Sequence, residues 1–280
     1  VIGGLVSLCG ALCVAELGAA MPRAGGQYVF LSRAYAPLAG FLYGWSAFLV
    51  INTASVAAIA VGFATYLGFF VPLGPVGLKA VAVASILALT ALNCRGLREG
   101  ALTQNIFTTA KLAGLAGLVA AGFALGAGDW APVWPDGLAG QAGPFGLAMV
   151  AVLWTYDGWI ELTYVGSEVR QPGRTLPLGI LLATALVTVL YVAINAAYLH
   201  VLGPARVAAS PLVASETMAT VLGSVGATVV TVLILVSTLG ANNGIVFTAA
   251  RIPFAMAREG LFFRWAARVH PRWHTPVPAL

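Results

Sequence analysis

The strongest constraint on this chain is a series of long apolar runs, each long enough to cross the hydrocarbon core of a membrane. A spanning helix needs about 20 mostly apolar residues, and it must satisfy its own backbone hydrogen bonds because lipid cannot. Of the residues, 60% are hydrophobic and 8% are charged, whereas a soluble domain carries about 25% charged residues. We therefore predict an all-α membrane protein forming a single transmembrane domain over residues 1–280, with seven spans at 1–21, 36–70, 76–94, 101–126, 143–167, 176–202 and 222–257.

Basic residues gather in alternate loops between these runs. Loops rich in Lys and Arg stay in the cytoplasm, so these loops are predicted to be cytoplasmic and the protein to lie in the plasma or inner membrane. The net charge of +5 then reflects topology, and no nucleic-acid partner is expected. The basic residues in these loops are Arg23, Arg33, Arg95, Arg98, Arg170, Arg174, Arg251, Arg258, Arg264, Arg268 and Arg272.

The span 143–167 contains polar residues where an apolar helix should be least interrupted. Its middle reads "WTYDGWIE", with Asp157 and Gly158 side by side. A charged group at this depth costs at least about 2.5 kcal/mol, and Asp and Gly both lower helix propensity. We predict a break in the helix near residues 156–159. Free carbonyls at one helix end and free amides at the next would suit the two charges of a zwitterion, which indicates a transporter for a small solute.

The order of the runs indicates an inverted repeat. The spans 36–70 and 222–257 are longer than a perpendicular crossing requires, and each follows a shorter span and a short connector. The two connectors fall on opposite sides of the membrane, as in transporters built from inverted repeats. Trp130 and Trp134 lie in a polar loop and are predicted to sit at the outer membrane interface.

Four segments give the chain a family resemblance: "GALCVAELGAAMPRAGGQYVFL" (10–31), "FTTAKLAGL" (107–115), "WTYDGWIELTYVGSEVRQPGRTLP" (154–177) and "STLGANNGIVFTAARIPFAMAREG" (237–260). The chain resembles an amino acid permease of the amino acid–polyamine–organocation superfamily, starting at what would be the second transmembrane helix. The resemblance implies a LeuT-like inverted-repeat fold with about seven of its helices in this chain, the first helix and the last helices lying outside it. It also implies secondary active transport of amino acids by alternating access.

The resemblance assigns roles to the broken span, which would be the sixth helix. Trp154 would be an aromatic gate over the bound amino acid, and Gly158 the unwound hinge. Trp159 would line the pocket. The backbone carbonyls that receive the substrate ammonium would belong to Thr155, Tyr156 and Asp157. Many relatives have a small residue in place of Asp157, so its side chain could instead help to hold the ammonium or carry a proton.

Other expected site residues lie on the third and eighth helices of the family fold. Asn52 and Ser55 would face the pocket for the substrate side chain, although Asn52 could equally be a hydrogen-bonding residue between helices. Ser237 and Asn242 would form a polar band on the opposite side. No cofactor is expected.

Lys111 places an ammonium within the span 101–126. One interpretation is that its side chain reaches the membrane interface from shallow depth. The resemblance implies another, in which this lysine takes the place of a bound sodium ion. Transport would then be sodium-independent, by proton symport or by exchange, with protons as possible partners of the amino acid.

Carboxylates and arginines near the cytoplasmic ends of the spans could form an inner gate. Glu16 can reach Arg23, and Glu168 lies close to Arg174. The alternative is that these are static surface pairs that contribute little energy.

Other function classes fit less well. The three histidines lie near no cysteine or carboxylate cluster, and no nucleophile or metal-ligand motif is present, so no enzymatic activity is expected. A channel or receptor and an amine or polyamine carrier remain as alternatives. The lipid bilayer is an expected partner, and the sequence leaves the oligomeric state open.

Overall fold

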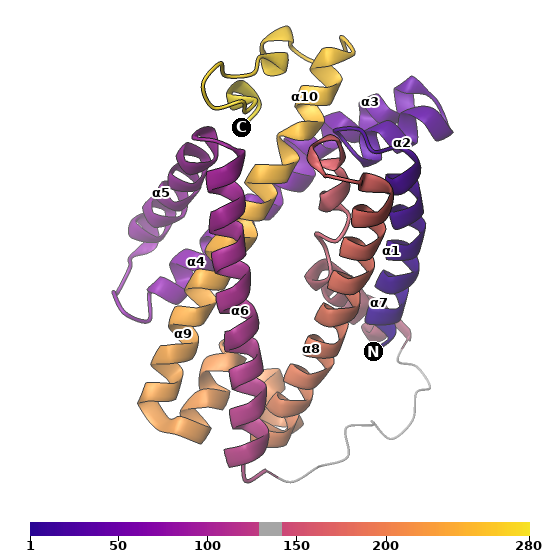
Figure 1. Ribbon diagram of the computed structural model, residues 1–280. Coiled ribbons are helices and arrows are strands. Elements are labelled where there is room, and N and C mark those ends of the chain that lie inside the picture. Colours follow the sequence, from indigo (N-terminus) through magenta and orange to yellow (C-terminus); the bar gives the residue numbers. More distant parts are fainter. Residues whose placement is uncertain (129–141) are drawn as a thin grey trace.

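The computed structural model describes residues 1–128 and 142–280, and every regular element in these ranges is helical (Figure 1). In the described part, six helical stretches are long and apolar enough to span a membrane. They are α1 (Ile2–Ala20), the stretch Pro37–Leu67 built from α3 (Pro37–Ser46) and α4 (Asn52–Leu67), α5 (Pro75–Cys94), α6 (Leu97–Leu125), α8 (Pro172–Ala209), and the stretch Val213–Arg258 built from α9 (Val213–Ala249) and α10 (Arg251–Arg258). The protein is therefore a multi-pass membrane protein. Trp130 and Trp134 lie outside the described residues.

The remaining apolar helix, α7 (Ala142–Thr155), is shorter than the others. It ends just before Asp157 and Gly158, at the position where the sequence predicts a break. The chain then continues through two short helical turns, Glu161–Thr163 and Gly166–Glu168, instead of a second half-helix. The span expected over residues 143–167, with a break near 156–159, is therefore a regular α-helix only up to Thr155.

The long helices are bent at identifiable places. The stretch Pro37–Leu67 contains a π-helical turn at Ala47–Ile51, which joins α3 to α4. Backbone φ angles are +74° at Gly203 within α8 and +66° at Gly223 within α9. Glycine adopts such left-handed angles without a Cβ clash. The two kinks set off the end of α8 and the start of α9 as short helical segments between the long parts of the two helices.

The two connectors lie at opposite ends of the molecule. The first contains α2 (Gln27–Ala34), which lies at the same end as α10 and the C-terminus, whereas the start of α9 lies at the other end (Figure 1). The α1 helix packs along α8, and α9 packs along both α6 and α4. Contacts between the first and second halves of the chain thus hold the helices together.

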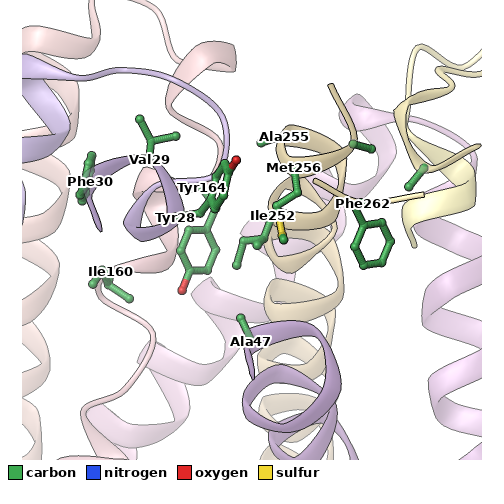
Figure 2. Close-up of a cluster of buried hydrophobic side chains, with 12 residues drawn as sticks. Tyr28, Val29, Phe30, Ala47, Ile160, Tyr164, Ile252, Ala255, Met256 and Phe262 are labelled. Carbon is green, nitrogen blue, oxygen red and sulfur yellow. The ribbon is translucent and has the colours of Figure 1, made fainter. Parts of the chain in front are cut away.

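The main buried cluster lies at the end that carries α2 and α10. It joins α2, the segment after α7, and α10, with Tyr28, Tyr164, Ile252 and Met256 among its members (Figure 2). Gly44 allows α3 to approach α10 closely, because a Cβ there would lie 2.2 Å from the sulfur of Met256. This end is therefore closed by packed side chains. The broken segment, residues 156–171 between α7 and α8, continues from it toward the middle of the molecule.

Candidate functional site

The centre of the candidate site is the irregular backbone that follows α7. The amides of Tyr156 and Asp157 bond back to the carbonyls of Leu153 and Trp154, each at 3.1 Å, which tightens the last turn. Gly158 then has φ of +109°, a value that other residues rarely adopt. The next regular bond joins the amide of Glu161 to the carbonyl of Gly158 at 3.1 Å. The helix therefore ends because Gly158 turns the chain out of helical geometry.

This turn leaves backbone polar groups without helical partners. Within the described ranges, no backbone amide donates to the carbonyls of Tyr156 and Asp157, and the amides of Gly158 and Trp159 donate to no backbone carbonyl. The carbonyl of Thr155 is reached by a side chain, since the hydroxyl of Tyr191 donates to it at 3.1 Å. Free carbonyls attract a cation and free amides attract an anion, so both halves of a zwitterion find partners here.

These groups open into a cavity of about 240 Å³ between the broken segment, α6 and α8. Its size suits a small solute. Tyr156 is buried and meets the ring of Tyr191 edge to face, with 5.2 Å between ring centroids. Trp159 also packs toward α1, where a Cβ at Gly10 would lie 3.0 Å from its ring. The cavity is lined by Lys111, Thr155, Tyr156, Asp157, Gly158, Trp159, Ala183, Thr184, Val187 and Tyr191.

The cavity contains two opposite charges that do not pair with each other. Lys111 comes from α6 and Asp157 from the broken segment, and no ion pair or hydrogen bond involves either side chain within the described residues. Lys111 also lines a second cavity of about 230 Å³, which it shares with Tyr66, Tyr198 and Ser237. The ammonium is thus positioned between the broken segment and α9.

Several predicted site residues lie elsewhere. Trp154 is 56% exposed at the end of α7 and does not line the cavity. Asn52 lines a different cavity, of about 190 Å³, between α4, α5 and α9. Ser55 lies half-buried on α4. Asn242 is buried on α9, and its Oδ1 atom accepts no hydrogen bond. The structure therefore brings residues 155–159 together with Lys111, and it separates Asn52, Ser55 and Asn242 from them.

Asn243, next to Asn242, has a structural role. Its Oδ1 accepts from Nδ2 of Asn93 at 2.9 Å, and its own Nδ2 donates to Oε1 of Gln104 at 2.9 Å. These side chains come from α9, α5 and α6, so the network joins three helices in the membrane. Buried amides of this kind hold transmembrane helices in register.

The predicted pair between Glu168 and Arg174 is not formed. Glu168 instead accepts two bonds from Arg251, at 3.0 Å from Nε and 3.1 Å from Nη2. Gln171 has φ of +49° and reverses the chain between Glu168 and α8, which leaves Arg174 exposed. Arg251 is only 3% exposed, and its guanidinium also lies over the ring of Phe247 at 4.5 Å. The pair therefore connects the broken segment to the junction of α9 and α10.

The predicted pair between Glu16 and Arg23 is also not formed. Both side chains are exposed, and neither has an ion-pair partner in the described ranges. A nearby interaction that the sequence did not reveal joins Tyr28 to Glu259, with 2.5 Å between the phenol oxygen and Oε2. Burial and the neighbouring carboxylate raise the pKa of the Tyr28 phenol above its usual range. Tyr28 therefore stays protonated and can donate this bond.

Two further polar contacts of the broken segment were missed. Glu161 accepts a hydrogen bond from Thr248 of α9 at 2.9 Å. The Tyr164 hydroxyl lies 2.9 Å from that of Tyr43, and Tyr43 also donates to Gln27. A carboxylate inside an apolar run was the available sequence signal for Glu161, but nothing local indicates which helix it faces.

Comparison with known proteins identifies relatives of the whole chain. The profile of the amino acid permease family matches residues 1–280. The b(0,+)-type amino acid transporter 1 of Oryctolagus cuniculus is 36% identical over 284 residues, covering 99% of this chain and 58% of that protein. The large neutral amino acids transporter small subunit 2 of Homo sapiens is 36% identical over 292 residues, covering 100% of this chain and 54% of that protein. The chain thus spans somewhat more than half the length of these relatives.

Proposed function

Because this chain belongs to the amino acid permease family of the amino acid–polyamine–organocation superfamily, we propose that its protein carries out secondary active transport of amino acids across the cell membrane by alternating access. The observation that carries the proposal is the break after α7. Its unpaired carbonyls and amides open into a cavity that also contains Lys111 and Asp157. Family and relatives are transporters, so the protein is not an enzyme.

The cavity can recognise the backbone of an amino acid. The free carbonyls of Tyr156 and Asp157 suit its ammonium, and the free amides of Gly158 and Trp159 suit its carboxylate. The Asp157 side chain adds a negative charge to this cavity and favours substrates with extra positive charge. The related b(0,+)-type and large neutral amino acid transporters make amino acids the first substrates to test.

Lys111 supports transport without sodium. Its ammonium lies between the two cavities, where it supplies a fixed positive charge between the broken segment and α9. A sodium ion at the same place would be repelled by it. We propose that exchange or proton coupling drives transport instead, and that the loops rich in arginine face the cytoplasm.

The experiment is transport by the full-length protein in liposomes. Uptake of labelled amino acids should saturate, and unlabelled amino acid inside should accelerate it, because only a carrier must reorient its site. Uptake that neither saturates nor responds to internal substrate would favour a channel. Replacing sodium with choline should leave uptake unchanged, and strong sodium stimulation would contradict the role proposed for Lys111.

An amine or polyamine carrier is the second candidate, favoured by the Asp157 carboxylate in the cavity. Such a substrate has no carboxylate to occupy the amides of Gly158 and Trp159. Thermal stabilisation of the full-length protein by the twenty amino acids, by polyamines and by simple amines separates the two. Stabilisation by amines alone would contradict the assignment to amino acids.

A further inference from the structure

We propose that Glu161 carries a proton that competes with the ammonium group of the substrate, so that substrate binding releases a proton from the broken segment. The inference rests on the proposed transport function. Its starting point is position: Glu161 follows the Gly158 hinge by three residues and is the side chain through which the short turn Glu161–Thr163 hydrogen-bonds to α9.

The hydrogen bonds of Thr248 give this proton a structural consequence. Its hydroxyl oxygen lies 2.9 Å from Oε2 of Glu161 and 2.9 Å from the carbonyl of Gly244 in its own helix. A hydroxyl has one hydrogen to donate. When Glu161 is protonated, it donates to Thr248, and Thr248 donates to Gly244. When Glu161 is ionised, Thr248 must turn its hydrogen to the carboxylate and release the Gly244 carbonyl. Protonation of Glu161 therefore reverses the direction of the hydrogen bond that joins the broken segment to α9.

No cation stabilises the ionised form. In the described ranges, Glu161 forms no ion pair, and the guanidinium of Arg251, three residues after Thr248 at the start of α10, is already bonded to Glu168. An unpaired charge away from water is costly, so a proton is the natural partner of this carboxylate.

The other groups around this turn add no positive charge. The titratable neighbours on the same segment and on α3 are Asp157, Tyr164 and Tyr43. The carboxylate of Asp157 is negative when ionised, and the two tyrosine hydroxyls are uncharged when protonated. Among the described residues, the contacts of α8 and α1 with this turn involve side chains that do not titrate. These contacts are Gly179 against Leu162, and Leu176 and Gly18 near Thr163.

Asp157 couples this proton to the substrate. Asp157 lines the cavity and precedes Glu161 by four residues, in a turn where the amide of Glu161 bonds to the carbonyl of Gly158 at 3.1 Å. Two negative charges held this near each other repel. A substrate ammonium beside Asp157 cancels this repulsion and favours ionised Glu161, which releases its proton to water. By linkage, a proton on Glu161 weakens substrate binding to the same extent. The binding of one substrate ammonium beside Asp157 thus releases one proton from Glu161.

The test is equilibrium binding of L-arginine and L-leucine to the purified full-length protein between pH 5 and 8. Binding by the parent should weaken as pH falls, by at most about tenfold per pH unit for one competing proton, and should release protons into a weakly buffered solution. Glu161→Gln keeps the shape and can still donate to Thr248, so its affinity should be independent of pH and no proton should be released.

Two variants of α9 test the contact independently of Glu161. Thr248→Val removes the donor to the ionised carboxylate of Glu161, which makes ionisation less favourable. The loss of substrate affinity on acidification should therefore begin at a higher pH than in the parent. Thr238→Val removes another hydroxyl that bonds only within α9, and should leave the pH dependence unchanged.

The possible failures are distinguishable. Unchanged pH dependence in Glu161→Gln, or a parent affinity that does not vary with pH, overturns the assignment of the proton and leaves amino acid transport intact. A parent that binds neither arginine nor leucine at any pH contradicts the proposed function itself.

Discussion

The buried pair between Glu168 and Arg251 yields an asymmetric prediction for stability. The side chain of Arg251 is 3% exposed and that of Glu168 is 30% exposed. Removing the carboxylate therefore leaves a buried cation without a partner, whereas removing the cation leaves a carboxylate that water can reach. Leaving one member of a buried pair unpartnered costs about 3–5 kcal/mol. We expect Glu168→Ala to fall near the lower end of this range, about 3 kcal/mol, because the Phe247 carbonyl and ring still contact the guanidinium.

Arg251→Met should cost less, about 1–2 kcal/mol, since an apolar side chain of similar length fills the buried site. In the double variant no buried charge is stranded, so the two effects should not add, and the cycle should show a coupling of at least about 1 kcal/mol.

The assay is thermal unfolding of the full-length protein in detergent, following the loss of the monodisperse species on size exclusion. Arg174→Ala is the matched control, because it removes an exposed arginine near the same carboxylate and should leave the midpoint unchanged. Additive effects of Glu168→Ala and Arg251→Met, or an Arg174→Ala loss as large as that of Arg251→Met, would refute the reasoning.

Three further predictions follow from single positions. Asn243→Leu should lower the free energy of unfolding by about 2 kcal/mol, because the amides of Asn93 and Gln104 lose their partner, and thermal unfolding measures it. Gly158→Ala should lower the free energy of unfolding by about 1–2 kcal/mol, because alanine is strained at a φ of +109° even though the space around it is open, and the transport rate should fall. Unchanged stability and transport rate would contradict a role for Gly158 as a hinge. Trp154→Ala should change stability and substrate affinity little, because the ring is 56% exposed and does not line the cavity; a marked loss of uptake would place Trp154 in the substrate site after all.

The sequence specified the features that depend on local chemistry. Long apolar runs require helices in lipid wherever the chain lies, so the membrane class follows from composition and run length. The Asp157–Gly158 pair weakens helix propensity at one point, and α7 ends at Thr155, two residues before Asp157. Motifs alone were enough to place the chain in the amino acid permease family.

Only the tertiary structure decided which side chains meet. Glu168 lies six residues from Arg174, yet it pairs with Arg251, 83 positions away, because the backbone at Gln171 turns and α10 packs against the broken segment. Lys111 faces two cavities, and Asn52 faces neither of them. A helical sequence shows which residues share one face, but the partner of that face depends on how distant helices pack, and no local pattern encodes this.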